Sequence, residues 1–188
     1  MRIIAGSLKG RRLKTPDWPG VRPTSDKLRE TLFNVLGQRL DGLRVLDAYA
    51  GTGAVGIEAL SRGAAHVTFV DHDRRAVALI EANLRACAVT GRYAIIRVDF
   101  ARALSELAGP AFDIIFLDPP YGRAELDRAL EGAAALATPD ATVVVEHAKR
   151  DAAPARFGPL VLARDLVAGD SALAFYRATE RTRENLEP

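Results

Sequence analysis

The sequence is poor in the residues that stabilise small secreted domains and metal sites. It contains one cysteine, Cys87, which excludes a disulfide framework, a cysteine-based zinc site and an iron–sulfur cluster. Its three histidines, His66, His72 and His147, lack the spacing of metal ligands, so we expect no metal ion. No apolar run approaches the ~18 residues that a membrane span needs, and the first residues lack the apolar stretch of a signal peptide. We therefore expect a cytoplasmic protein with no membrane partner, and nothing demands more than a monomer.

The rest of the composition is that of an ordinary globular protein. The 188 residues are 48% hydrophobic and 27% charged, which is enough apolar material to bury one core. The net charge is +2 but unevenly distributed: residues 1–29 carry eight basic and two acidic side chains, a charge of +6, and the remaining residues sum to −4. A basic head on a mildly acidic body predicts contact with a polyanion, the alternative being a solvated basic surface.

Residues 1–40 read as an extension that belongs to the same domain as the residues that follow. Short β-like pieces at residues 2–4 and 11–13, broken by glycine and proline, predict a small hairpin and an extended arm. Thr24 or Ser25 can then cap a helix, whose apolar residues recur at helical spacing up to Leu36, and Gly37 can end it.

Residues 41–180 form the main part of the expected domain, in which short apolar strands alternate with helices. We expect strands at 43–47, 66–70, 93–98, 113–117 and 141–146, and helices at 54–61, 74–88, 101–107 and 123–137. That alternation is typical of a parallel sheet covered on both faces. Residues 160–167 and 172–178 predict an antiparallel hairpin at one edge, and residues 181–188 a tail. The expected fold is α/β, with a doubly wound, mostly parallel sheet of seven strands.

A glycine-rich turn, Gly51-x-Gly53-x-x-Gly56, follows the first strand and is a nucleotide-binding fingerprint. Asp71 ends the second strand, where an acid would hold ribose hydroxyls, so the pattern taken alone predicts a dinucleotide dehydrogenase. Asp47 argues against that reading, because a carboxylate at the end of the first strand would repel a pyrophosphate. The same carboxylate would attract a cation, and S-adenosylmethionine carries an ammonium and a sulfonium beside an adenosine.

The acids at the strand ends are therefore interpreted as cofactor contacts. We expect Asp47 to accept from the amino group of S-adenosylmethionine, directly or through water, and Asp71 to accept from its ribose hydroxyls. Asp99 and Phe100, after the third strand, can bond the adenine amine and pack against its ring. The alternative for Asp99 is the N-cap of a helix, since aspartate is among the preferred capping residues.

The fourth strand ends in Asp118-Pro119-Pro120-Tyr121. Two prolines remove two backbone donors and leave the preceding carbonyls free to accept. Asp118 and the Pro119 carbonyl can hold the two protons of an exocyclic amine and aim its nitrogen at a methyl group. Tyr121 offers a flat face for a splayed-out base, an interaction worth roughly 1–3 kcal/mol. We expect these four residues to form the catalytic box.

Several blocks along nearly the whole chain are shared with one family. They are Arg2-Ile3-Ile4-Ala5-Gly6, Gly10-Arg11, Arg22-Pro23-Thr24-x-Asp26-x-x-Arg29-Glu30-x-Leu32-Phe33, Asp47-x-x-Ala50-Gly51-Thr52-Gly53, Gly56-x-Glu58-Ala59-Leu60-Ser61-Arg62-Gly63, Asp118-Pro119-Pro120-Tyr121 and Val145-Glu146. On these residues the sequence resembles the bacterial 16S ribosomal RNA guanine-N2 methyltransferases, which are small Rossmann-like class I enzymes.

The resemblance implies methylation, with S-adenosylmethionine as cofactor, of the exocyclic N2 amine of a guanine in the helix 31 loop of 16S rRNA. It implies that the RNA is met within an assembling small ribosomal subunit. The cofactor contacts carried over or read from the turn are Asp47, Gly51, Thr52, Gly53, Asp71, Asp99 and Phe100. The expected RNA contacts are the basic residues of the arm: Arg2, Lys9, Arg11, Arg12, Lys14 and Arg22.

Other interpretations stay open at this point. An adenine-N6 methyltransferase shares the Asp-Pro-Pro-Tyr box, a dehydrogenase shares the glycine turn, and a non-catalytic RNA-binding protein would explain the basic arm. Glu58 can simply pair with an arginine, and Trp18 can stack on RNA or cover the sheet edge. Glu146, near the end of the fifth strand, can touch a substrate or form a structural salt bridge.

Overall fold

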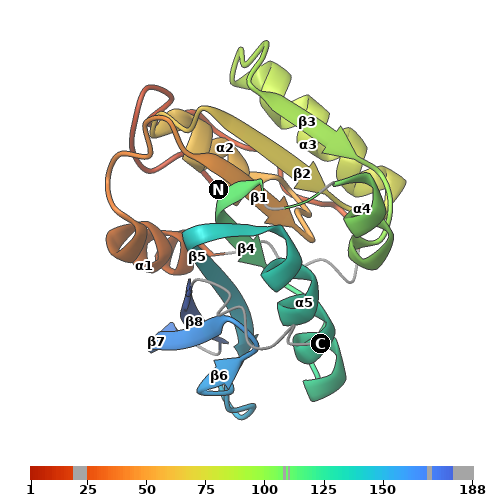
Figure 1. Ribbon diagram of the computed structural model, residues 1–188. Coiled ribbons are helices and arrows are strands. Elements are labelled where there is room, and N and C mark those ends of the chain that lie inside the picture. The colour runs from red at the N-terminus through yellow and green to blue at the C-terminus, as the bar shows by residue number, and fades with distance from the viewer. Residues whose placement is uncertain (19–24, 108, 110, 169–170, 180–188) are drawn as a thin grey trace.

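The computed structural model describes residues 1–18, 25–107, 109, 111–168 and 171–179, and these form three layers, a sheet between two sets of helices (Figure 1). In chain order the elements are α1 (Asp26–Leu36), β1 (Arg44–Ala48), α2 (Ala54–Ser61), β2 (His66–Val70), α3 (Arg74–Ala86), β3 (Tyr93–Ile96), α4 (Phe100–Glu106), β4 (Phe112–Leu117), α5 (Arg123–Leu136), β5 (Ala137–Ala148), β6 (Arg156–Phe157), β7 (Leu160–Ala168) and β8 (Ser171–Ala178). The tail at 181–188 lies outside the described residues. Within them, no helix combines the length and the apolar character that crossing a bilayer requires.

The strands lie in the order β3-β2-β1-β4-β5-β8-β7-β6. β1 to β5 pair in parallel, and β8 pairs antiparallel with both β5 and β7. The predicted doubly wound sheet with an antiparallel C-terminal hairpin is confirmed. It has eight strands among the described residues, not seven, because Arg156 and Phe157 pair with β7 as a two-residue strand, too short to leave a periodic pattern.

β5 begins at Ala137, four residues before the expected strand, and ends at Ala148. Its first residue pairs with Phe112 of β4 across a register shift. Pro139 and Asp140, the latter at a φ of 65°, interrupt the strand-like sequence between the helix and the apolar run. The apolar run in the sequence therefore predicted only the buried second half of this strand.

Each face of the sheet is covered by its own helices. The core on one face joins Phe33 of α1, Leu60 of α2 and Ile80 of α3. The core on the other face joins Phe100 of α4 and Leu130 of α5. Gly56 of α2 permits close packing on the first face, since a Cβ there would lie 2.3 Å from the Phe69 ring. This glycine of the fingerprint therefore serves helix-to-sheet packing.

The N-terminal hairpin packs onto the first of these cores. Arg2 and Arg12 form an antiparallel bridge, and Ile3 donates to the Arg11 carbonyl at 2.9 Å. Ile3 and Leu13 are buried in the main core, so the extension contributes to it and has none of its own. The predicted helix follows as α1, capped by the Ser25 side chain, which accepts from the Leu28 amide at 3.1 Å.

Glu58, fully buried on α2, ties the extension to the sheet domain. Its two oxygens accept from the Ile4 and Ala5 amides at 2.8 and 2.9 Å. They also accept from Arg29 Nη1 of α1 at 3.3 Å and from Arg62 Nε at 3.0 Å. The Arg29 side chain is fully buried as well and donates to the Arg2 carbonyl at 2.8 Å. The carboxylate thus satisfies four donors from three segments.

We predict that Glu58→Gln lowers the free energy of unfolding by about 3–5 kcal/mol, because it removes the buried counter-charge that Arg29 and Arg62 share and leaves Arg29 only the half-exposed Asp26. The measurement is urea denaturation followed by circular dichroism. Asp26→Asn is the matched control: Asp26 also pairs with Arg29, at 2.6 Å, but its side chain is 52% exposed. Its removal should cost about 0–1 kcal/mol. Equal losses from the two variants would contradict the central role of Glu58.

Candidate functional site

The predicted cofactor and catalytic residues gather at the carboxyl ends of the parallel strands. Asp47 lies in β1, one residue before its end, and Asp71 and Asp118 directly follow β2 and β4. β1 lies between β2 and β4 in the sheet, so these three acids come from adjacent strands. In an open α/β sheet this edge is where ligands bind.

The glycine turn is held by backbone hydrogen bonds. Ala50 donates to the Val70 carbonyl at 3.0 Å, and Gly53 donates to the Ala50 carbonyl at 2.7 Å. Gly53 has a φ of 73°, in the left-handed region that glycine adopts without strain, and it is the N-cap of α2. Thr52 is buried between them, and its carbonyl accepts from Nδ2 of Asn83 at 3.0 Å. The turn is therefore a preformed part of the sheet edge.

Asp47 is buried beneath this turn, with 2% of its surface exposed. Its Oδ2 accepts from the Gly56 amide at 2.8 Å. Burial raises the pKa of Asp47 to about 8, against a smaller lowering by the Gly56 hydrogen bond. No lysine, arginine or histidine of the described residues forms an ion pair with it. A ligand cation would supply the counter-charge that the described protein lacks.

Asp71 braces the glycine turn against α3. Its Oδ2 accepts from the Gly51 amide and its Oδ1 from the Asp73 amide, both at 2.8 Å. A carboxylate oxygen has two lone pairs, so each oxygen can still accept from one ligand hydroxyl. The hydrogen bonds fix the direction in which those lone pairs point.

Asp99 is the N-cap of α4, the alternative recognised in the sequence, and accepts from the Arg102 amide at 2.9 Å. Phe100 is buried, and its ring lies 5.6 Å from the half-buried ring of Tyr49. Tyr49 has a φ of 62°, in the left-handed region, and burial raises its pKa to about 12. Sequence reasoning assigned Tyr49 no role. The only available signal was an aromatic residue inside the glycine-rich segment.

The Asp118–Tyr121 segment leaves the sheet with Asp118 partly buried and the Tyr121 ring exposed. Pro119 is buried, whereas Pro120 and Tyr121 are exposed, Tyr121 to 55%. The Tyr121 hydroxyl lies 3.2 Å from the Ser171 hydroxyl at the start of β8. A narrow depression beside the segment is lined by Pro119, Pro120, Tyr121, Gly122, Leu126, Glu146, His147, Ala148 and Asp151.

Asp47, Asp118 and Glu146 lie on the same face of the sheet. Phe116 of β4 pairs with Asp47 of β1 and with Val144 of β5, so these three side chains point to one face of the sheet. Asp118 lies two residues after Phe116 and Glu146 two residues after Val144, and side chains two residues apart in a strand point to the same face. Burial raises the pKa of Asp118 to about 8, with repulsion by Glu146 and Asp47 adding to the effect. Burial also raises the pKa of Glu146. Three carboxylates therefore meet at this edge in a poorly hydrated setting.

The predicted RNA contacts lie on the N-terminal hairpin, which packs against the C-terminal ends of α2 and α3, and on the arm that follows it. Arg2, Lys9, Arg11, Arg12 and Lys14 are all exposed, and Arg22 lies outside the described residues. Asn83 of α3 accepts from the Lys14 amide at 2.7 Å and also binds the Thr52 carbonyl. The arm therefore runs to the glycine turn, although the two are far apart in sequence.

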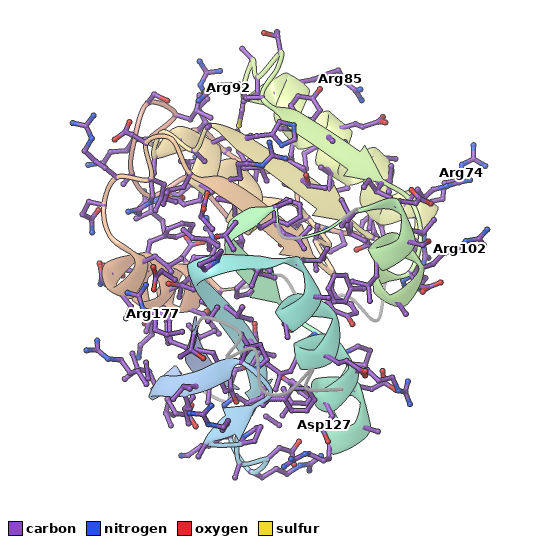
Figure 2. All side chains as sticks on the ribbon, in the orientation of Figure 1. Arg74, Arg85, Arg92, Arg102, Asp127 and Arg177 are labelled. Carbon is purple, nitrogen blue, oxygen red and sulfur yellow. The ribbon has the colours of Figure 1, made fainter. Side chains whose placement is uncertain are left out.

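Basic side chains are not confined to the arm. Figure 2 shows Arg74, Arg85, Arg92 and Arg102 pointing outward on the side of α3 and α4. The guanidinium of Arg75 of α3 lies over the ring of Trp18, 5.2 Å from its centroid. His147 contacts Asp165 at 3.1 Å, and the described residues contain no group of three or more histidine, cysteine or acidic side chains that could hold a metal.

Comparison with known proteins gives a consistent set of relatives. Residues 1–177 match the family described as Conserved hypothetical protein 95. The chain is 40% identical over 181 residues to "Putative rRNA methyltransferase YlbH" of Bacillus subtilis (strain 168), covering 94% of this chain and 98% of that protein. It is 39% identical over 182 residues to "Ribosomal RNA small subunit methyltransferase D" of Escherichia coli (strain K12), covering 94% and 89%.

The fold has a close counterpart among solved structures. The structure named "Putative methyltransferase yhhF from Escherichia coli" superimposes with a TM-score of 0.81 at 35% identity, covering 95% of this chain and 98% of that one. The likeness extends through the N-terminal extension and the C-terminal hairpin.

We predict that the ligand-free protein loses stability as the pH rises from about 5 to about 8. In this range the unfolded chain has ionised Asp118 and Asp47, whose ordinary pKa is near 3.8, whereas the folded protein keeps their protons up to about 8. The folded state thus binds more protons, and its free energy of unfolding falls with pH. Chemical denaturation at several pH values measures the slope.

Asp118→Asn should reduce that slope, because it removes one titrating carboxyl and its repulsion of Asp47 and Glu146. Asp41→Asn is the control, since Arg39 lowers the pKa of the Asp41 carboxyl and keeps it ionised across the range. An Asp118→Asn protein with the parent's slope would show that Asp118 titrates normally in the folded state.

Proposed function

The chain belongs to the Conserved hypothetical protein 95 family, and we propose that it transfers a methyl group from S-adenosylmethionine to the exocyclic N2 amine of a guanine in 16S ribosomal RNA. The observation that carries the proposal is a pair of acids on adjacent strands: the buried Asp47 beneath a glycine turn, and the partly buried Asp118 beside an exposed Tyr121. The first suits a cationic cofactor and the second a neutral amine. The names of the relatives support the reaction class and the RNA substrate.

The residues at the turn fit this cofactor. The buried Asp47 has a raised pKa and no ion-pair partner among the described residues, and an ammonium group would stabilise its charged form. Asp71 offers two oriented oxygens to hydroxyls, and Phe100 with Tyr49 offers aromatic surface for an adenine. S-adenosylmethionine, when bound, supplies an electrophilic methyl group on a sulfonium.

The catalytic box acts on the amine. Asp118 and the Pro119 carbonyl accept its two hydrogens and so direct the nitrogen lone pair, while Tyr121 stacks on the base. As the new carbon–nitrogen bond forms and the carbon–sulfur bond breaks, the nitrogen becomes cationic and acidic. Asp118 then accepts the released proton. The pKa of Asp118 is raised to about 8 in the ligand-free protein, so in this proposal the positive charge of the bound cofactor stabilises the ionised carboxylate that accepts the proton.

The basic arm positions the RNA. Its side chains are exposed and its backbone reaches the glycine turn at Lys14, so phosphates bound along the arm would direct the RNA toward the sheet edge that carries Tyr121. Phosphate contacts of this kind position a substrate without reading its sequence. In this proposal a single chain works in the cytoplasm on an assembling small ribosomal subunit, and the helix 31 loop presents the target guanine. The direct test is the mass and position of the methylated nucleoside in rRNA from cells with and without the gene.

Asp47→Asn and Asp118→Asn should separate binding from chemistry. In Asp47→Asn the amide oxygen can still accept from the Gly56 amide, but the charge is gone, so S-adenosylmethionine should bind more weakly by about 1.5–3 kcal/mol. Asp118→Asn should bind the cofactor nearly as well as the parent, while the methylation rate collapses. Calorimetry and single-turnover methyl transfer measure the two effects. Similar mild losses in both assays for both variants would contradict the assigned roles.

Replacing Arg11 and Arg12 with alanine should flatten the salt dependence of RNA binding. Each phosphate neutralised contributes about −0.7 to −0.9 to the log–log slope, so the double variant should lose roughly one to two units. The control removes the same charge at the opposite edge of the sheet, from the exposed Arg156 and Arg164 of β6 and β7. An unchanged slope in the first variant, or an equal change in the control, would exclude the arm as the phosphate-binding surface.

A further inference from the structure

Glu146 of β5 is a buried acid to which the proposed reaction assigns no role. Its exposed fraction is 8%, and its Oε2 has no hydrogen-bond partner among the described residues. An unpaired buried carboxylate oxygen is costly to a folded protein, so its presence calls for a partner that arrives later.

The other buried glutamate shows what a structural role looks like in this protein. Glu58 accepts four hydrogen bonds, two from backbone amides and two from arginines. No described basic side chain forms an ion pair with Glu146, and the adjacent His147 has both ring nitrogens placed elsewhere, on the Ala148 carbonyl and on Asp165. Glu146 is thus not the centre of a salt bridge among the described residues.

The surroundings of Glu146 are those of the catalytic box. It lines the same depression as Pro119, Pro120 and Tyr121. Leu117 pairs with Val145, so Asp118 and Glu146 hold the next positions on neighbouring strands, and repulsion by Glu146 helps to raise the pKa of Asp118. The Ser171 hydroxyl lies 3.2 Å from the Tyr121 hydroxyl, and it lowers the pKa of Glu146 against the larger effect of burial.

We propose that Glu146 reads the Watson–Crick edge of the target base by accepting a hydrogen bond from guanine N1–H. This inference rests on the proposed function. Guanine presents N1–H directly beside the N2 amine, so an acceptor next to Asp118 meets the second donor of the edge while Asp118 holds the first. Adenine presents an acceptor at N1, which would face the carboxylate oxygen and leave it unpaired. Glu146 is therefore a specificity-determining and positioning residue.

The test uses RNA in which the target guanine is replaced by 2-aminopurine. This base keeps the amine at C2 but has an acceptor, not a donor, at N1. The parent should methylate guanine with a kcat/KM about 10- to 100-fold higher than that for 2-aminopurine. With the analogue bound, the buried Glu146 carboxylate faces another acceptor and makes no hydrogen bond to it. In Glu146→Gln the amide can donate to N1 of 2-aminopurine, so the preference should shrink or invert.

Two further variants make the result specific. Glu146→Asp keeps the charge but withdraws the carboxylate by one methylene; it should lower kcat/KM for guanine and leave that for 2-aminopurine unchanged. Glu131→Gln, the same chemical change on the exposed side of α5, should keep the parent's preference. Thermal unfolding and the Kd for S-adenosylmethionine establish that each variant is folded and loaded.

The outcomes distinguish this inference from the function on which it rests. A parent that leaves guanine N2 unmodified would overturn both. If the parent methylates guanine N2 and Glu146→Gln keeps the parent's preference between the two bases, only the reading role of Glu146 is overturned. Should Glu146→Gln not fold, Glu146→Asp decides in the same way.

Discussion

The buried carboxylate of Glu58 is the constraint on which the arrangement of this molecule depends. It lies in the middle of α2, the helix that begins at the glycine turn. Two amides of the N-terminal hairpin and one arginine of α1 converge on it. A buried charge is tolerated only when nearly all its lone pairs accept hydrogen bonds. The hairpin, α1 and α2 must therefore pack in the one arrangement that brings these donors to the Glu58 carboxylate and offsets its desolvation. The basic arm is thereby held along the helix that also frames the proposed cofactor turn.

The opposite situation holds at the carboxyl ends of the strands. There the buried Asp47 and Glu146 and the partly buried Asp118 lie on one face of the sheet with few donors and raised pKa values. Such groups destabilise the ligand-free fold and are stabilised by a cation or by donor groups of a base. The molecule thus uses buried acids in two ways. Glu58, whose oxygens accept four hydrogen bonds, holds the fold together. The three acids at the strand ends accept few hydrogen bonds within the protein and are available to bind ligands.

Features that depend on a continuous segment could be predicted from the sequence, and features that depend on contacts between distant segments could not. The glycine turn and the Asp-Pro-Pro-Tyr box could be predicted because each is a continuous segment whose chemistry is local. The capping role of Ser25 and the hairpin of β7 and β8 were predictable for the same reason. Asn83, which joins the Lys14 backbone to the Thr52 carbonyl, could not be predicted, because its hydrogen-bond partners come from two distant segments. Tyr49 was visible in the sequence, but its contact with Phe100 depends on how the turn and α4 pack.

The sequence by itself determined the class of fold, the parallel strands and the segments that bear the proposed chemistry, since these follow from local periodicity and from short motifs. Only the tertiary structure decided which acids are saturated and which are not. Glu58 and Glu146 look alike in the sequence, since each directly follows apolar residues. Their difference arises from neighbours contributed by other segments: four donors around one, and an unpaired oxygen on the other. Desolvation and hydrogen bonds from distant segments set the pKa and the stability of a buried charge. Neither can be predicted from the residues next to it in the sequence.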